Sequence, residues 1–216
     1  MTVALVLFDL DGTLVDSLQD LTDAVNHMLA GFGRPALNTF EVKQLVGKGA
    51  RNLVQRALAT SSSVDIEAGL AAFTEFNEIH IADNSRLYPG VLELLQQLRA
   101  DGIRMAVISN KNEALSRLIL KALKVDVYFD IIAGGDTFLE MKPSPLPLLQ
   151  VIEKLCSSPA DSIMVGDSIN DIQAGNRAKI TTIGCSWGYG NREELSESEY
   201  LADSCSDIIN ILRALD

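Results

Sequence analysis

Short apolar runs recur along the chain with the composition of strands that are buried on both faces of a sheet. The clearest runs are Val3 to Phe8, Ile103 to Ile108, Ser162 to Val165 and Thr181 to Gly184, with Asp130 to Ala133 as a weaker fifth. Between the runs, apolar residues recur at helical spacing, for example from Val91 to Leu98. Because strands alternate with helices, the pattern predicts an open, doubly wound (Rossmann-like) α/β fold with a parallel sheet.

The interval between the first two predicted strands is longer than a strand–helix–strand step requires. Such a step needs about 30 residues, whereas the first run ends at Phe8 and the next begins at Ile103. Residues 17–84 show only helical periodicity. We therefore expect a small α-helical cap domain inserted into a core domain of residues 1–16 and 85–216. Its two connections would lie close together and act as a hinge for a lid over the first strand.

Composition and charge narrow the classes of partner and site. The 216 residues include 18 Lys and Arg against 29 Asp and Glu, a net charge of −11. An acidic protein repels nucleic acids and anionic lipids, and no apolar run approaches the roughly 18 residues of a membrane span. The two histidines exclude a three-histidine zinc site, and three cysteines without a C-x-x-C pair favour the reducing cytoplasm. A small metabolite is the expected partner, and monomer and homodimer both stay open.

Two pairs of carboxylates follow predicted strands. Asp9 and Asp11 come directly after the first run, and Asp167 and Asp171 follow the third. Ligands of open α/β sheets bind beyond the carboxyl ends of the strands, so we expect both pairs at one edge of the sheet. Each pair alone has a structural alternative, since Asp-Gly is common in turns and Ser168 has the spacing of a helix cap with Asp171. Together, such oxygen ligands favour a hard cation, above all Mg²⁺.

Two further segments offer groups that bind anions. Ser109 and Asn110 end the run from Ile103 to Ile108, where a hydroxyl and the N–H groups of a following helix would hold phosphate oxygens. Lys142 stands just before Pro143 and a predicted helix. Alone, each has an ordinary explanation, a helix N-cap for Ser109 or Asn110 and a solvated surface lysine for Lys142.

These segments together resemble the four motifs of the haloacid dehalogenase-like hydrolase superfamily. The matching stretches are Asp9-x-Asp11-Gly12-Thr13, Ser109-Asn110, Lys142-Pro143 and Gly166-Asp167-x-x-x-Asp171, in that superfamily's order. The helical insert resembles the cap found in its phosphoglycolate phosphatases and phosphosugar mutases. Dehalogenases of the superfamily work without metal and lack an acid at the Asp11 position. The resemblance therefore points to phosphate chemistry.

The resemblance implies a role for each acidic residue. Asp9 is the expected nucleophile, which forms an aspartyl phosphate, and Asp11 is the expected general acid and base. Mg²⁺ is expected on the Asp9 carboxylate, the Asp11 main-chain carbonyl and Asp167. Asp171 is expected to orient these ligands without binding the ion itself.

The resemblance also implies roles for the neutral and basic residues. Ser109 and Lys142 are expected to bind the transferring phosphoryl group, and Thr13 and Asn110 to assist through hydrogen bonds. From a different functional class, a catalytically silent sensor of phosphorylated ligands is an alternative. The intact set of acids argues against it.

The predicted cap carries a candidate determinant of the substrate. Lys48 and Arg51 lie beside Gly49 before a predicted helix, where they would compensate a second anionic group; solvated side chains are the alternative. This stretch, Gly134 to Leu149 and Trp187 to Gly190 are similar to phosphoglycolate phosphatases. That similarity implies Mg²⁺-dependent hydrolysis of 2-phosphoglycolate to glycolate and phosphate. The cap loop also resembles that of β-phosphoglucomutases, and a pyrophosphatase or nucleotidase is a further alternative on this fold.

Overall fold

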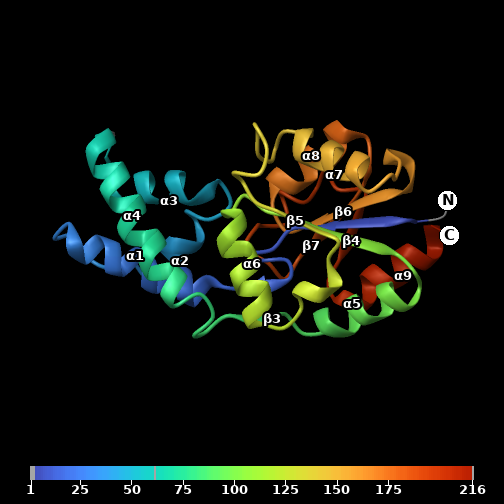
Figure 1. The fold of residues 1–216 in the computed structure, drawn as a ribbon, viewed down its shortest axis with the longest axis horizontal. Helices are drawn as coiled ribbons and strands as arrows, with labels where there is room; N and C mark the ends of the chain where they lie inside the picture. The colour runs from blue at the N-terminus through green and yellow to red at the C-terminus, as the bar shows by residue number, and fades with distance from the viewer. Residues whose placement is uncertain (1–2, 61, 216) are drawn as a thin grey trace.

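A parallel sheet forms the centre of the protein in the computed structural model, which describes residues 3–60 and 62–215 (Figure 1). In this part of the chain six strands pair in the order β5-β4-β1-β6-β7-β8, all parallel. Their bounds are β1 (Leu5–Phe8), β4 (Arg104–Ile108), β5 (Ile131–Ala133), β6 (Ser162–Gly166), β7 (Thr181–Cys185) and β8 (Tyr200–Ala202). The predicted doubly wound fold is confirmed.

Helices cover both faces of this sheet because alternate strand residues point to opposite sides. Leu5 and Leu7 of β1 pack toward α7 (Leu146–Lys154) and α8 (Ile169–Ala178). Val6 and Phe8 belong to the opposite core cluster. The helices of that face are α5 (Val91–Ala100), α6 (Glu113–Ala122) and α9 (Cys205–Leu215). Short 3₁₀ turns, Asp126–Tyr128 and Pro159–Asp161, precede β5 and β6.

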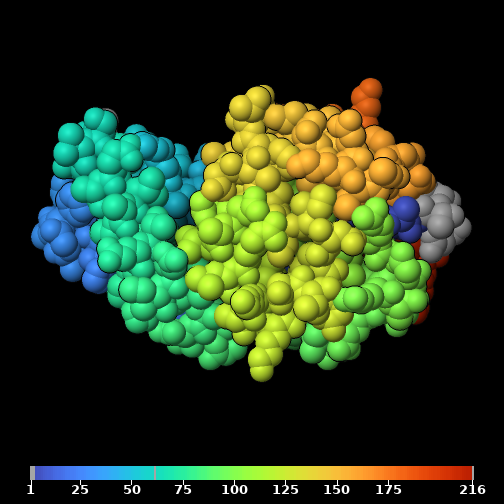
Figure 2. All heavy atoms as spheres, viewed as in Figure 1, coloured from blue at the N-terminus to red at the C-terminus, as the bar shows by residue number. Residues whose placement is uncertain are grey.

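The segment after β1 forms a separate helical unit, which Figure 2 shows as one lobe of the molecule beside the α/β unit. Its helices are α1 (Leu18–Gly31), α2 (Thr39–Lys43), α3 (Gly49–Leu58) and α4 (Ser63–Ile79). Their inner faces enclose a hydrophobic cluster that includes Val25, Met28, Val54 and Phe73. The unit therefore has a core of its own, and we refer to it as the cap.

The two connections between the cap and the sheet lie side by side. The strand β2 (Val15–Asp16) pairs antiparallel with β3 (Arg86–Leu87). The buried carboxylate of Asp20 accepts hydrogen bonds from the main-chain N–H of Asn84 and from the N–H and hydroxyl of Ser85. We propose the cap boundaries at residues 17 and 84 on this basis; residues 1, 2 and 216 of the predicted core lie outside the described residues.

Two details of the chain differ from the sequence-based expectation. The strand β8 was not anticipated, because Tyr200 and Leu201 stay partly exposed and only Ala202 is buried. The helix expected directly after Ser109 and Asn110 begins later, because the side chain of Asn112 accepts the N–H of Ala114 and fixes the start of α6 there. No helix in residues 3–60 or 62–215 has both the length and the apolar composition of a membrane span.

Candidate active site

Asp9 and Lys142 form a buried ion pair at the carboxyl end of β1. The main-chain N–H of Asp9 extends the sheet by donating to Val165 O at 2.9 Å. Lys142 Nζ lies 2.8 Å from Asp9 Oδ1 and 2.6 Å from Asp171 Oδ1, and it also donates to the main-chain O of Ile108. The ammonium group therefore contacts residues at the carboxyl ends of three neighbouring strands or just after them, namely β4, β1 and β6.

Burial controls the charge state of this pair. Burial raises the pKa of Asp9 to about 8, Lys142 opposes the shift, and Asp171 and Asp167 add to it. Burial alone would lower the pKa of Lys142, but the Asp171 and Asp9 carboxylates outweigh it and the pKa rises. The site thus combines a lysine that stays charged with an aspartate whose ionised form needs further positive charge nearby.

Asp167 lies beside the pair and is held by donors from two loops. Thr13 Oγ1 donates to Asp167 Oδ1 at 2.9 Å, and the main-chain N–H of Tyr189 donates to Asp167 Oδ2 at 2.6 Å. Gly12, at φ +93°, lets the first loop approach so closely that a Cβ there would overlap the Asp167 carboxylate. Burial, together with the charge of Asp171, raises the pKa of Asp167 to about 6 despite these hydrogen bonds.

The carboxylates of Asp9, Asp167 and Asp171 form a cluster that fits a divalent metal. One oxygen from each lies within 4.8 Å of the others. Asp171 Oδ2 accepts from the N–H and hydroxyl of Ser168, and Asp171 Oδ1 contacts Lys142. Asp167 accepts hydrogen bonds at both oxygens, whereas Asp9 contacts Lys142 through Oδ1 only. Their oxygen atoms are the donors that Mg²⁺ prefers, and the excess of buried negative charge is what such an ion would offset.

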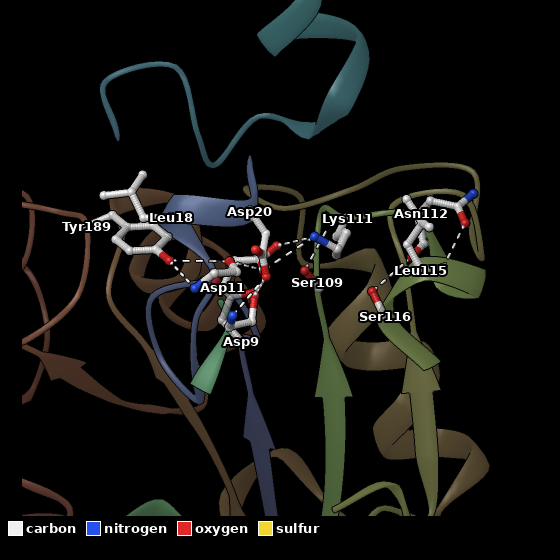
Figure 3. Close-up of polar contacts among 12 residues, drawn as sticks. Asp9, Asp11, Leu18, Asp20, Ser109, Lys111, Asn112, Leu115, Ser116 and Tyr189 are labelled. Atoms are coloured by element: carbon white, nitrogen blue, oxygen red, sulfur yellow. Dashed lines mark hydrogen bonds and ion pairs between the residues drawn. The ribbon is translucent and has the colours of Figure 1, made fainter. Parts of the chain in front are cut away.

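Asp11 lies beside Asp9 and is held from two sides (Figure 3). Ser17 Oγ donates to Asp11 Oδ1 at 2.6 Å, and Lys111 Nζ lies 3.3 Å from Asp11 Oδ2. The hydroxyl of Tyr189 in turn accepts the N–H of Ser17 at 2.8 Å. Burial and the nearby Asp11 carboxylate raise the pKa of Tyr189, so its hydroxyl stays neutral. The side chain of Asp11 is thereby oriented toward the cavity above β1.

The predicted phosphate-binding residues Ser109 and Asn110 also lie at this edge of the sheet. Ser109 is buried, and its main-chain N–H donates to Ala133 O at 2.9 Å. Its hydroxyl accepts the N–H of Lys111 at 3.1 Å, which leaves the O–H free to donate into the cavity. The Nδ2 of Asn110 instead donates to the main-chain O of Lys142 at 2.8 Å and to the main-chain O of Gly47 in the cap. It therefore positions Lys142.

The cap touches the sheet edge through the loop before α3. The main-chain O of Gly47 accepts from Asn110 Nδ2 at 2.9 Å and from Asn170 Nδ2 at 3.2 Å. Gly47 has φ +104°, a conformation that L side chains rarely adopt. Lys43 Nζ adds a contact to Gly188 O at 3.2 Å. The cap is thus closed over the carboxylate cluster.

Closure leaves a cavity of about 60 Å³ between the cap and the sheet edge. Its polar lining comes mainly from the sheet edge and includes Asp9, Asp11, Ser109, Lys111, Lys142 and Asp171. Its apolar lining comes from the cap and includes Leu21, Val46, Leu53 and Phe73. Because the charged side chains gather at the sheet edge, this cavity favours a ligand with its charged end at Asp9.

The two cap cations predicted to contact the substrate lie in different places. Arg51 is exposed, with 57% of its side-chain surface accessible, and pairs with Glu67 on α4. It lines a cavity of about 450 Å³ on the side of Met141, which borders the cavity at Asp9 through Gly49 and Asn110 but is not lined by Asp9 itself. Lys48 lines that cavity too, but it also lines a third cavity of about 260 Å³ that reaches Asp9. The structure therefore brings Lys48 toward the carboxylates and leaves Arg51 outside.

Replacing each of these cations by alanine should separate their contributions. We expect Lys48→Ala to raise KM for an anionic substrate by about 3- to 10-fold, because it removes a cation from a cavity at the carboxylates. Arg51→Ala should change KM by less than about 2-fold, because exposed ion pairs contribute little. Steady-state kinetics of the two variants under identical conditions check this order. A larger effect at Arg51 would contradict it.

Three residues of the site escaped the sequence-based prediction. Lys111 follows Ser109 and Asn110 directly, but a lysine after a strand is usually solvated. Tyr189 lies in the glycine-rich stretch after β7, and nothing in its spacing indicates a contact with Ser17. Asn77 of α4 lines the cavity, although its position marked only a helix face in the sequence.

Comparison with known proteins assigns the family. The haloacid dehalogenase-like hydrolase family model matches residues 6–185. "Phosphoglycolate phosphatase 1" of Pseudomonas aeruginosa is 43% identical over 200 residues, which cover 89% of this chain and 73% of that protein. The "Phosphoglycolate phosphatase" of Chromobacterium violaceum is 36% identical over 213 residues, with 96% of each chain covered.

A solved structure agrees over nearly the whole chain. It is the crystal structure of a "predicted phosphoglycolate phosphatase" from Haemophilus somnus, with a TM-score of 0.93 and 32% identity. The match covers 98% of this chain and 99% of that one. The fold, the carboxylate cluster and these similarities agree, and the chain belongs to the haloacid dehalogenase-like hydrolase family.

Proposed function

We propose that this protein is a divalent-metal-dependent phosphomonoesterase that hydrolyses 2-phosphoglycolate to glycolate and phosphate through an aspartyl phosphate. The observation that carries this proposal is the buried contact of Asp9 with Lys142 in the lining of a cavity beneath the cap. The relatives named phosphoglycolate phosphatase support the substrate.

Asp9 is the proposed nucleophile. Its carboxylate attacks phosphorus in line, and the bond from phosphorus to the leaving oxygen breaks as the aspartyl phosphate forms. Lys142 Nζ, 2.8 Å from Asp9 Oδ1, holds the carboxylate in place and offsets charge on the phosphoryl oxygens. The Ser109 hydroxyl donates to a phosphoryl oxygen from the neighbouring strand end.

Asp11 is the proposed general acid and base. It gives a proton to the leaving oxygen and later takes one from the water that attacks the aspartyl phosphate. Ser17 orients its carboxylate by donating to Asp11 Oδ1 at 2.6 Å. The closed cap keeps bulk water from the reacting atoms, as the Gly47 contacts to Asn110 and Asn170 support.

Asp9 and Asp167 are the proposed direct carboxylate ligands of Mg²⁺, with the Asp11 main-chain carbonyl as a third ligand. When bound, the ion would offset repulsion between the Asp9 carboxylate and the phosphate. Thr13 holds Asp167 from one side, and Asp171 holds Lys142 from the other. These contacts fix the carboxylates before any ligand arrives.

A substrate panel tests the proposal directly. Phosphate release from 2-phosphoglycolate, hexose phosphates, pyrophosphate and nucleotides is measured with MgCl₂ and with EDTA. We expect metal-dependent release with 2-phosphoglycolate dominant, because relatives that cover most of this chain are named phosphoglycolate phosphatase. A sugar-led profile would refute the substrate, and equal release in EDTA would refute the metal requirement.

Metal binding should stabilise the protein more at high pH. The pKa values of Asp9 and Asp167, about 8 and about 6, lie above the unfolded value of 3.8. The metal-free folded state therefore holds protons that the unfolded state has lost, and its stability falls as pH rises toward 8. Ionised carboxylates bind the ion, so the rise in Tm caused by MgCl₂ should be larger at pH 8 than at pH 6. Thermal unfolding with MgCl₂ and with EDTA measures it, and equal shifts at both pH values would contradict it.

We also propose that the enzyme acts in the cytoplasm on a small phosphorylated metabolite, as a monomer or homodimer. The net charge of −11 and the exposed Cys156 support this setting. Light scattering of the purified protein distinguishes the two assembly states.

A further inference from the structure

Two polar side chains of the catalytic cavity have no part in the chemistry at phosphorus. Lys111 lies in the loop after β4, and Asn77 lies on α4 of the cap. Both line the cavity that contains Asp9 and Asp11. The accessible fraction is 8% for the Lys111 side chain and 2% for Asn77. They come from opposite sides of the cavity and face the same space.

Asn77 is buried without full hydrogen bonding. Its Oδ1 has no partner among the described residues, although the side chain lies among apolar groups such as Leu53 and Phe73. A buried amide oxygen without a partner destabilises the folded state, so its presence at a cavity points to a polar ligand group. The amide can present either its oxygen or its two N–H donors to that group, because the two ends exchange by rotation.

Of the two lysines that line the cavity, Lys111 is the one whose ammonium group has N–H donors available to a ligand. Lys142 already contacts Asp9, Asp171 and Ile108 O. Lys111 Nζ contacts only Asp11 among the described residues, at 3.3 Å and 3.5 Å from its two carboxylate oxygens (Figure 3). An ammonium group has three donors, so a further oxygen fits beside Asp11.

The proposed reaction places an anionic group at this point. Asp11 protonates the leaving oxygen, and in 2-phosphoglycolate a single methylene separates that oxygen from a carboxylate. The substrate carboxylate therefore comes close to the carboxylate of Asp11. Once Asp11 has given up its proton, the two carboxylates repel each other, and Lys111 Nζ, 3.3 Å from Asp11 Oδ2, supplies the positive charge that offsets this repulsion. Arg51 lies outside this cavity, in its pair with Glu67.

We infer that Lys111 and Asn77 form the subsite for the second anionic group of the substrate, its carboxylate. Lys111 supplies the charge and Asn77 supplies an N–H donor from the cap. The inference rests on the proposed function and adds the residues that recognise the substrate carboxylate. It also explains how a closed cap recognises the ligand, since one donor comes from each side of the cavity.

The test compares 2-phosphoglycolate with ethyl phosphate, which has a methyl group in place of the carboxylate. The measured quantity is the ratio of kcat/KM for the two substrates in the presence of MgCl₂. Effects of Lys111 that act through Asp11 change both substrates and cancel in the ratio. We expect Lys111→Met to lower the ratio by about 10- to 100-fold and Asn77→Leu by about 3- to 10-fold. Lys111→Arg should keep most of the preference.

Stability separates a binding role of Asn77 from a structural one. Leucine has nearly the shape of asparagine and no polar atoms, so Asn77→Leu should raise Tm while it lowers the ratio. A structural asparagine would give the opposite change in Tm. Lys121→Met, an exposed lysine on α6, is the matched control and should leave the ratio unchanged. Should Lys111→Met fail to fold, Lys111→Gln takes its place.

The outcomes separate the inference from the proposed function. A wild-type ratio near one would refute 2-phosphoglycolate as the substrate, and the subsite with it. A high wild-type ratio that survives both Lys111→Met and Asn77→Leu would leave the proposed function standing and overturn the subsite. A high ratio that falls in both variants supports it.

Discussion

Replacing Asp9 with asparagine should lower kcat by about 10⁴-fold or more, because the amide oxygen is not a nucleophile toward phosphorus. The fold should survive, since asparagine has the same shape and can still accept the hydrogen bond from Lys142. In metal-free protein Tm should rise, because ionising Asp9 in its buried position is unfavourable, as its pKa of about 8 indicates. Phosphate release and thermal unfolding measure the two effects.

Detection of the intermediate distinguishes the loss of a nucleophile from the loss of a metal ligand. Wild-type protein quenched with acid during turnover should carry one phosphoryl group on the peptide that contains Asp9, removable by hydroxylamine. Asp167→Asn is the matched control, because it alters a proposed ligand and keeps the nucleophile. Activity retained in Asp9→Asn, or a phosphoryl group on another residue, would refute the assignment of Asp9.

Replacing Lys142 with methionine should damage both stability and turnover. The substitution leaves the buried carboxylates of Asp9 and Asp171 without their shared cation, which lowers the free energy of unfolding by about 3 kcal/mol near pH 8. The loss should be smaller near pH 5.5, because the pKa of Asp9 is raised to about 8 and its carboxyl group is then protonated in the folded state. We expect kcat to fall by about 10²- to 10³-fold as stabilisation of the phosphoryl oxygens is lost.

Denaturant unfolding of metal-free protein at the two pH values measures the stability effect. Lys121→Met again serves as the control for loss of one positive charge, since Lys121 is exposed. A destabilisation that does not depend on pH would show that Lys142 acts through packing and not through its charge. Full activity in Lys142→Met would remove it from the mechanism.

The sheet and the carboxylate cluster were predictable because each depends on a local signal. A strand buried on both faces must be apolar throughout, and a group at its carboxyl end lies at the sheet edge wherever the remaining chain goes. Asp9 and Asp167 needed no more than that, and the structure places both in one cluster of carboxylates with Asp171. The capping geometry of Ser168 with Asp171 also follows from spacing alone and is present, although Asp171 contacts Lys142 as well.

The remaining features depend on contacts between distant segments. A basic residue shows no sign in the sequence of whether its side chain is solvated, like Arg51, or enclosed, like Lys111. Asn77 occupies a helical position that periodicity assigns to packing, and only the folded structure shows that its amide oxygen lacks a partner. The strand β8 could not be predicted from the sequence, because a three-residue edge strand with one buried side chain shows no hydrophobic periodicity.

The carbonyl of Gly47, which receives side chains from both Asn110 and Asn170, has a consequence for divergence within the family. The cap is held closed at this point through a main-chain oxygen. A substitution at another cap position does not remove this acceptor. The neighbouring cap positions are thus free to change and to alter which ester is accepted, while the closed geometry persists. Selectivity in such an enzyme can evolve without rebuilding the catalytic apparatus.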